Sequence, residues 1–294
     1  MKIDYRALYA LDAVIQNQSF ALAAKQLFVT QPAVSQRIKQ LENYVGQPLL
    51  IRTLPYAATP LGEKLLSLLR RTRLIEEHFL QELEHDVPSR LSIALNRDSL
   101  ETWFIKALSK LTSLEVSNID IITDDQELTI DYFRKGAVSA CITSYAKPLP
   151  GCECQLLGNM DYLLVASPEF IERYFEKHLS LKENMMAAPI LLFDSRDRLH
   201  EYYFQYFFGS SFYPKRYHMV PSVGGFKQFA LQGYGFGLIP RLDIHDELKQ
   251  GALIEINQGK RWLMPLYWHY WQLPARQYQQ FIQQVASEAK QYLL

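Results

Sequence analysis

The chain lacks an overall charge that would attract it to a polyanion, because 31 Lys and Arg balance 31 Asp and Glu among 294 residues. The distribution along the chain is less even. Residues 1–60 carry six basic and three acidic side chains, a net charge of +3, so the remaining residues carry −3. A mildly basic head on a mildly acidic body is compatible with DNA binding at one end, but alone it is weak evidence for it.

Cysteines and long apolar runs are also scarce. There are three cysteines, and Cys152 and Cys154 are separated by a single residue, which suits no common zinc motif. No apolar run approaches the roughly 20 residues that span a bilayer. The first residues lack the uninterrupted apolar stretch of a signal peptide. We therefore expect reduced thiols, no metal site and no membrane partner in a cytoplasmic protein.

Common catalytic motifs are missing as well. The sequence contains no Gly-x-Ser-x-Gly elbow, no His-Glu-x-x-His pair and no P-loop. The glycines of Gly233–Gly237 superficially suggest a nucleotide loop, but they lead into a predicted strand, whereas a dinucleotide loop follows a strand and opens a helix. An enzyme is therefore disfavoured, and we expect no cofactor.

What the chain does have begins with three short helices. Apolar residues recur with a helical period over residues 4–16, and Ser19 is a good N-cap for a second helix over residues 20–28. Thr30 caps a third helix, over residues 31–45. Two helices joined by a tight turn at this spacing predict a helix-turn-helix.

The third helix has two contrasting faces. Its apolar face should pack against the other two helices and comprises Val34, Ile38, Leu41 and Val45. The opposite face is polar and comprises Gln31, Ser35, Gln36 and Lys39, with Arg37 at its border and Pro32 in the first turn. Such side chains suit base edges and phosphates in a major groove. We expect base contacts from Gln31, Ser35 and Gln36, and phosphate contacts from Thr30, Arg37 and Lys39. An ordinary solvated helix face is the alternative.

A wing and a long helix are predicted next. After Gly46, two short strands are expected, with Arg52 at their edge as a phosphate or minor-groove contact, or simply as a surface arginine. Thr59 caps a helix over residues 60–85, and residues 86–89 are a plausible hinge. The helix carries a heptad seam of Leu61, Leu65, Leu68, Thr72, Ile75 and Phe79. Such a seam needs a partner helix, which favours a homodimer; packing against the chain's own body is the alternative.

From residue 90 onward, strand-like and helix-like segments alternate, which predicts an α/β body with largely parallel sheets. Helices are expected over 100–111 and 127–134. Strands are expected over 91–95, 119–122, 139–143, 162–166, 190–193, 217–220, 237–239, 253–256 and 266–271. The length suits two lobes, with the chain crossing between them near 161–167 and 261–268.

Polar residues at strand ends and helix starts are candidates for a small-molecule site between the lobes, where free N–H groups favour a carboxylate. They are Ser99, Asp124, Asp125, Thr143, Asp161, Tyr162, Asp194 and Ser222. For each Ser the alternative is a simple N-cap, and for each Asp a cap or a surface ion pair. A transport solute-binding protein would also suit this body, but the absence of a signal peptide and the DNA-reading head argue against it.

The head resembles the DNA-binding domain of LysR-type transcriptional regulators. The residues that carry the resemblance are Ala23-Ala24, Leu27, the run Thr30-Gln31-Pro32-Ala33-Val34-Ser35-Gln36-Arg37-Ile38-Lys39-Gln40-Leu41-Glu42, then Gly46, Leu49-Leu50-Ile51-Arg52 and Thr59-Pro60-Leu61-Gly62-Glu63. The resemblance implies a winged helix-turn-helix (1–59), a linker helix and hinge (60–88), and a periplasmic-binding-protein-like effector domain (89–294). Lobe I would cover about 89–161 and 267–294, and lobe II about 162–266.

The body resembles the arginine- and lysine-responsive branch of that family. The segments concerned are Asn96-Arg97-Asp98-Ser99-Leu100, Asp161-Tyr162-Leu163, Phe193-Asp194 and Leu266-Tyr267-Trp268-His269. The branch implies a lysine or arginine effector, a dimer or tetramer on double-stranded DNA, and control of amino-acid export or biosynthesis genes. One departure is that the family pattern Ser-Ser-Glu-Ala-Phe is replaced by Ser222-Val223-Gly224-Gly225-Phe226, and Arg196 and Arg198 follow Asp194. A different small amphoteric or carboxylate effector is therefore the alternative.

Overall fold

The head consists of three helices around a small apolar core. The structure, a computed structural model, describes residues 3–83, 90–111, 118–273 and 275–294. Its first elements are α1 (Tyr5–Asn17), α2 (Phe20–Gln26) and α3 (Gln31–Val45). Val34, Ile38 and Leu41 of α3 are buried against α1 and α2, as predicted. The predicted helix-turn-helix is therefore confirmed.

The predicted caps explain where these helices begin and end. The Ser19 hydroxyl accepts a hydrogen bond from the Leu22 N–H at 3.3 Å, and the Thr30 hydroxyl accepts one from the Ala33 N–H at 3.4 Å. Gly46 ends α3 with a φ of 73°, a conformation that a residue with a side chain rarely adopts. The two hydroxyls each pair with a backbone N–H that is otherwise unpaired at a helix start, and the glycine permits the backbone turn that ends α3.

A short antiparallel hairpin forms the wing, as predicted. Its strands are β1 (Leu50–Ile51) and β2 (Ala57–Ala58). Glu42 of α3 holds the wing in place, because its Oε1 atom accepts hydrogen bonds from the N–H groups of Leu49 and Leu50 at 3.0 and 3.4 Å. Its Oε2 atom lies 3.0 Å from Nη2 of Arg52. Helix α3 and the wing are thus one structural unit.

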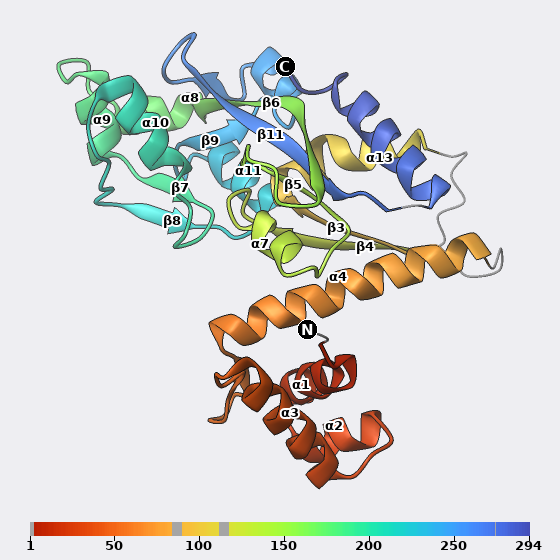
Figure 1. The fold of residues 1–294 in the computed structure, drawn as a ribbon. Helices are drawn as coiled ribbons and strands as arrows, with labels where there is room; N and C mark the ends of the chain where they lie inside the picture. The colour runs from red at the N-terminus through yellow and green to blue at the C-terminus, as the bar shows by residue number, and fades with distance from the viewer. Residues whose placement is uncertain (1–2, 84–89, 112–117, 274) are drawn as a thin grey trace.

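Helix α4 (Pro60–Leu83) lies between the head and the body (Figure 1). Its Leu66 and Leu69 are buried in the core of the head, and Arg73 Nη1 lies 2.8 Å from the buried carboxylate of Asp12. On the other side, the Ser67 hydroxyl donates to the Arg134 carbonyl at 2.6 Å. The chain's own head and body therefore contact this helix, which was the alternative to a partner helix, but part of its apolar surface stays exposed.

The predicted heptad seam is exposed toward the end of α4. Ile75 and Phe79 retain 53% and 51% of their accessible surface, and Leu80 beside them retains 48%. The predicted end of the helix at His85 and the predicted hinge at 86–89 lie outside the described residues. An apolar stripe of this kind on a charged helix requires an additional partner to be buried.

The body alternates strands with helices. Its strands are β3 (Arg90–Asn96), β4 (Asn118–Asp124), β5 (Ala140–Thr143), β6 (Cys152–Ala166), β7 (Ile190–Leu192), β8 (Tyr217–Met219), β9 (Gly237–Pro240), β10 (Ile254–Glu255) and β11 (Arg261–Trp271). Its helices are α5 (Arg97–Ser99), the π-helical turn η1 (Leu100–Phe104), α6 (Ile105–Ser109), α7 (Thr129–Arg134), α8 (Pro168–Tyr174), α9 (Leu181–Ala187), α10 (Leu199–Phe208), α11 (Val223–Leu231), α12 (His245–Gln250) and α13 (Arg276–Ala289).

Two long antiparallel strands, β6 and β11, connect two lobes. They pair from Arg261 opposite Leu163 to Trp271 opposite Cys152. In the first lobe β3 pairs in parallel with β4 and β5, and in the second β7 pairs in parallel with β8. The two-lobed α/β prediction is confirmed. The expectation of largely parallel sheets is wrong, because β6 also pairs antiparallel with β9 and β10. The sequence pattern shows burial, and burial does not reveal strand direction.

Apolar packing follows this division. One core joins the first lobe to part of the second and includes Trp103, Trp268 and Phe281, all nearly inaccessible to water. A smaller core lies in the second lobe around Leu191 and Phe226. Within the described ranges, no helix combines the length and the apolar character that crossing a bilayer requires. Among the same residues, no group of His, Cys, Asp and Glu forms a metal site.

Candidate functional site

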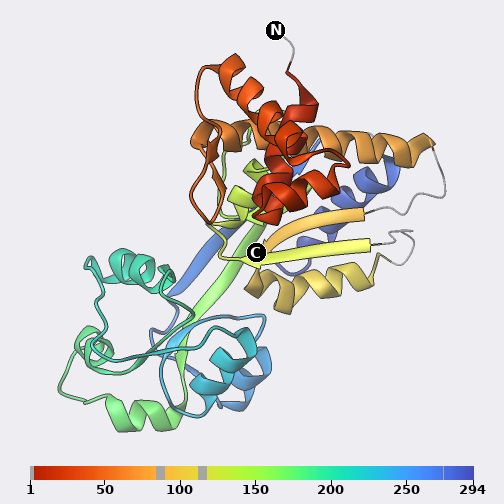
Figure 2. The same ribbon diagram turned by 90° about the horizontal axis from the view of Figure 1, so that it is seen from below.

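A cavity opens between the two lobes, which β6 and β11 join (Figure 2). Its walls are the end of β3, the loop after β4, the segment 193–200, the start of α11 and strand β9. It encloses about 710 Å³, part of which is open to solvent. Polar side chains reach this cavity because strands from both lobes end beside it.

The walls of this cavity are strongly acidic. Six aspartates line it: Asp98, Asp124, Asp125, Asp194, Asp197 and Asp243. Asp243 is neutralised by Lys227, whose Nζ lies 2.9 Å from its carboxylate. Asp124 and Asp194 share one cation, because Nη2 of Arg196 lies 3.2 and 3.1 Å from their carboxylates. Arg97 is 4.0 Å from Asp124. Three of the six therefore have cationic partners within the chain.

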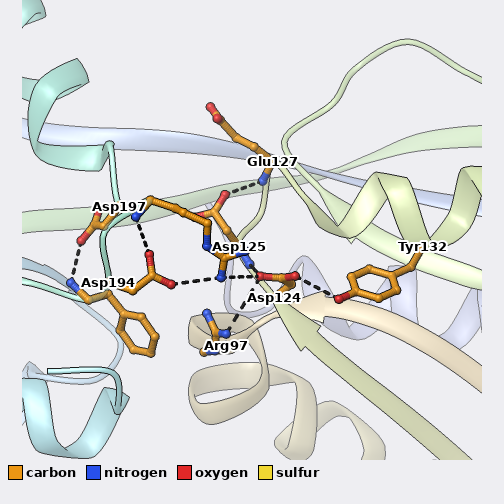
Figure 3. Close-up of polar contacts among 9 residues, drawn as sticks. Arg97, Asp124, Asp125, Glu127, Tyr132, Asp194 and Asp197 are labelled. Atoms are coloured by element: carbon orange, nitrogen blue, oxygen red, sulfur yellow. Dashed lines mark hydrogen bonds and ion pairs between the residues drawn. The ribbon is translucent and has the colours of Figure 1, made fainter. Parts of the chain in front are cut away.

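Asp124 and Asp194 face each other across the cleft (Figure 3). Asp124 ends β4 and also accepts a hydrogen bond from the Tyr132 hydroxyl at 3.1 Å. Partial burial alone would raise the pKa of Asp194, but hydrogen bonds from the backbone and guanidinium of Arg196 outweigh it and lower that pKa. The Asp194 carboxylate is consequently held in its charged form at neutral pH.

The other three aspartates have no Lys or Arg within 4.0 Å among the described residues. Asp98 accepts a hydrogen bond from the Tyr162 hydroxyl at 2.5 Å. Asp125 accepts one from the Glu127 N–H at 2.8 Å. Asp197 accepts N–H bonds from Phe193 and Leu199, at 2.9 and 3.1 Å, and lies 3.9 Å from Nδ1 of His200. Burial lowers the pKa of His200, so its imidazole is neutral and does not offset this charge.

The pKa values of Asp98 and Asp125 reflect the crowding of carboxylates in the cleft. Burial in the cleft wall, together with the charges of Asp197, Asp243 and Asp125, raises the pKa of Asp98 to about 6, against the effect of the Tyr162 hydrogen bond. Burial and the neighbouring carboxylates also raise the pKa of Asp125. Like charges that are partly removed from water disfavour one another. The cleft therefore carries an excess of negative charge that a cation would relieve.

Asn96 adds an unsatisfied polar group to the same wall. Its side chain is only 2% exposed, and neither its amide nitrogen nor its amide oxygen has a hydrogen-bond partner in the described part of the chain. An amide in this position can both donate and accept. Because unpartnered buried amides are costly, Asn96 is suited to a bound polar molecule.

The polar face of α3 forms a second candidate surface, on the head. Gln31, Gln36 and Lys39 are exposed, whereas Ser35 and Arg37 are half-buried. Ser35, Lys39 and Arg52 line an open hollow between α3 and the wing. The Arg52 guanidinium, which pairs with Glu42, is still 49% exposed and can contact a phosphate from this position. This combination of a polar helix and a basic wing suits nucleic acid.

Comparison with known proteins identifies both parts of the chain. Residues 5–63 match the family described as bacterial regulatory helix-turn-helix protein, lysR family. Residues 84–290 match the LysR substrate binding domain. The chain belongs to the LysR family. It is thus a LysR-type transcriptional regulator, with a DNA-binding head and an effector-binding body.

Individual LysR-family proteins resemble it over their whole length. An HTH-type transcriptional regulator ArgP from Vibrio parahaemolyticus is 38% identical, covering 99% of this chain and 98% of its own. The crystal structure of ArgP from Mycobacterium tuberculosis superposes with a TM-score of 0.87 at 33% identity, covering 99% of each chain. Full-length LysG from Corynebacterium glutamicum with bound effector Arg gives a TM-score of 0.80 at 30% identity, again covering 99% of each chain.

In this LysR-type regulator, four of the eight predicted effector residues line the cleft: Asp124, Asp125, Tyr162 and Asp194. The others do not. Thr143 is buried behind the cleft, where its hydroxyl donates to the carbonyl of Gln126, a lining residue, at 2.7 Å. Asp161 pairs with Arg261 at 3.2 Å, and Ser222 caps α11. The Ser99 hydroxyl is fully buried and has no hydrogen-bond partner among the described residues.

Seven polar residues of the cleft were not among the predicted effector residues: Asn96, Arg97, Asp98, Gln126, Asp197, His200 and Asp243. Asn96, Arg97 and Asp98 directly precede the predicted Ser99, so the strand-end signal pointed to this segment, but the residue that it selected is buried behind the cavity wall. Asp197 stands in a turn three residues after Asp194. Its role depends on how that turn folds back, because its carboxylate accepts the N–H groups on both sides of it.

Proposed function

We propose that this LysR-type regulator binds a basic amino acid, arginine or lysine, between its lobes and thereby controls transcription. The observation that supports this most strongly is the presence of Asp98, Asp125 and Asp197 in one cleft, with no Lys or Arg of the described residues within 4.0 Å of them. A ligand cation supplies the missing charge through charge-assisted hydrogen bonds. That LysG was solved with bound effector Arg is consistent with the same ligand class.

The rest of an amino acid also finds complementary groups in the cleft. We assign its α-carboxylate to the Asn96 amide and the Arg97 guanidinium, which both line the cavity. Tyr162 holds Asp98 in position, and Thr143 holds the Gln126 loop. In this proposal Ser99, Asp161 and Ser222 support the walls, Ser99 from directly behind the β3 end. A purely anionic metabolite is disfavoured, because it would add charge to a cleft that already has an excess of carboxylates.

A thermal-shift screen of the full chain against the twenty amino acids tests the proposal. A ligand at 100 times its Kd adds about 2.7 kcal/mol of stability. At about 2–4 °C per kcal/mol, the expected rise in Tm is roughly 5–10 °C with L-arginine or L-lysine. No shift with either, together with stabilisation by an acidic amino acid, would contradict a cation-binding cleft.

For the head, we propose that two copies read an inverted repeat in double-stranded DNA. Gln31, Ser35 and Gln36 contact bases, while Thr30, Arg37, Lys39 and Arg52 contact phosphates, with Pro32 starting the helix. Identical heads match a symmetric operator, and joining them raises the effective concentration of the second contact. The division into residues 1–59, 60–88 and 89–294 follows the same proposal.

The exposed stripe of α4 is assigned to the dimer contact, and two dimers on one promoter make a homotetramer. Ile75, Phe79 and Leu80 supply the apolar surface that the chain leaves uncovered. Sedimentation of the full chain as a dimer or tetramer is the expected result, and a monomer at micromolar concentration would contradict the assignment. Genes of amino-acid export or biosynthesis are the targets that a basic amino-acid effector suggests.

A further inference from the structure

Arg196 occupies an unusual position for a residue of the chain itself. It lies in the turn after β7, where its backbone N–H donates to Oδ1 of Asp194 at 2.7 Å. Its side chain then extends to the carboxylates of the cleft. A single nitrogen, Nη2, lies 3.1 Å from Asp194 of the second lobe and 3.2 Å from Asp124 of the first. One guanidinium of the protein thus bridges the two lobes.

The exposure of these three side chains shows how the contact is built. The Asp124 side chain is 13% exposed and that of Asp194 is 28% exposed, whereas Arg196 is 52% exposed. The two acids therefore belong to the cleft walls, and the arginine approaches them from the solvent side. Because more than half of its side chain is exposed, Arg196 can leave this position without opening the core of either lobe.

We infer that Arg196 is a specificity-determining residue, which competes with the cationic side chain of the effector for Asp124 and Asp194. This inference rests on the proposed function. Two carboxylates facing one guanidinium are the partners that a free arginine would also select. While Arg196 holds them, a bound cation has only Asp98, Asp125 and Asp197, and it also experiences repulsion from the Arg196 charge.

A purely structural role makes the opposite prediction. If Arg196 served only to hold the lobes together, its removal would favour the open arrangement and weaken every ligand, charged or neutral, by the same factor. Competition instead acts through charge. If Arg196 competes, its removal strengthens the binding of cationic ligands selectively, and this gain in affinity decreases at high salt.

The test uses the full chain and two ligands of nearly equal shape, L-arginine and its uncharged analogue L-citrulline. The variant is Arg196→Gln, and Arg198→Gln is its matched control. Arg198 stands two residues further on with a 58% exposed side chain, and among the described residues it pairs with Glu201 at 3.2 Å and with no aspartate of the cleft. Calorimetric titration at low salt gives the Kd for each ligand, and repetition at high salt shows the electrostatic part.

We expect Arg196→Gln to bind L-arginine about 3- to 10-fold more tightly than the wild type, as a partly exposed like charge a few ångströms away implies. Binding of L-citrulline should change by less than about 2-fold, and Arg198→Gln should leave both ligands within about 2-fold of the wild type. Binding of L-arginine by Arg196→Gln alone, with none detectable in the wild type, would support the inference equally.

Three results would overturn it. Unchanged affinity of Arg196→Gln for L-arginine excludes competition, and equal weakening of both ligands assigns Arg196 to lobe closure instead. In either case L-arginine binding by the wild type leaves the proposed function intact. If neither the wild type nor Arg196→Gln binds L-arginine or L-lysine, the proposed function fails, and the inference fails with it.

Discussion

Asp98 illustrates how a single residue reports on the chemistry of the cleft. It lies at the end of β3, half-buried, and its carboxylate accepts the Tyr162 hydroxyl at 2.5 Å. Burial and three neighbouring carboxylates raise its pKa to about 6. The folded protein thus holds a carboxylate whose charged form is destabilised. A cation bound beside it would favour the charged form and lower that pKa.

The sign of the resulting pH effect follows from linkage. Because the folded pKa of Asp98 is raised from 3.8 to about 6, its ionisation destabilises the fold progressively as pH rises through this interval. We therefore expect Asp98→Asn to raise the free energy of unfolding at pH 7.5 by about 1–2 kcal/mol. Near pH 3.5 the effect should vanish, since both side chains are then neutral. Thermal denaturation at the two pH values measures this difference.

The same substitution separates stability from binding. Asp98→Asn should weaken L-arginine binding by about 10-fold or more at pH 7.5, because it removes a charged partner from a partly desolvated site. In the wild type, affinity should fall as pH decreases from 7.5 to 5.5, and in Asp98→Asn this fall should be much smaller. A variant that is less stable at pH 7.5, yet binds normally, would contradict the role given to Asp98.

At the scale of elements, the sequence predicts the head most fully. Caps such as Ser19 and Thr30 act within a few residues, so the local pattern is sufficient to place α2 and α3. The long strands β6 and β11 were predicted only in part, over 162–166 and 266–271. Their remaining residues are partly exposed, as in β6, where only Leu157 is buried between Cys152 and Asn159. Their antiparallel pairing joins segments about 100 residues apart, which no local pattern reveals.

Helix α3 offers a test at the same scale. In gel shifts, Gln36→Ala should relax the preference for one sequence over another, because an amide that contacts a base edge contributes about 1–3 kcal/mol of discrimination. Lys39→Ala should weaken binding to all DNA about equally. It should also reduce the slope of log affinity against log salt concentration by about one. Both residues are exposed on the folded helix, so neither change should affect folding.

Lys25→Ala, which changes an exposed lysine in the last turn of α2, is a control for simple loss of charge. Its effect should be smaller than that of Lys39→Ala if α3 enters the groove. If Gln36→Ala and Lys39→Ala both leave sequence preference, affinity and salt dependence unchanged, α3 is not the reading helix of this protein.

At the scale of the whole molecule, the cleft exists only because distant segments converge. Residues 96–98 lie at the end of the first lobe's β3 and the start of α5, residues 124–126 lie at the end of β4 and just after it, and residues 193–200 belong to the second lobe. Half of the effector residues predicted from strand ends line the cavity. The others, such as Thr143 and Asp161, share the same polar character but bond inward or to a surface arginine. Only the folded chain distinguishes these cases.

The meeting of both lobes at one cleft also explains how ligand binding can affect the DNA-binding head. A ligand that contacts both lobes favours the arrangement in which they are closest, in proportion to its differential affinity for that arrangement. Helix α4 contacts the first lobe through Ser67 and the head through Leu66 and Leu69. We therefore expect a shift of the lobes to reach the helix that positions the DNA-reading surface.

Hydrogen–deuterium exchange of the full chain, with and without saturating L-arginine, tests the location and the ligand together. Amide protection reports which segments a ligand stabilises. The account predicts added protection at 96–99, 124–126 and 193–200, in both lobes at once, and none with L-glutamate. Protection confined to one lobe, or centred on the hollow between β11 and α13 that Trp271 and Tyr278 line, would contradict an effector site in the acidic cleft.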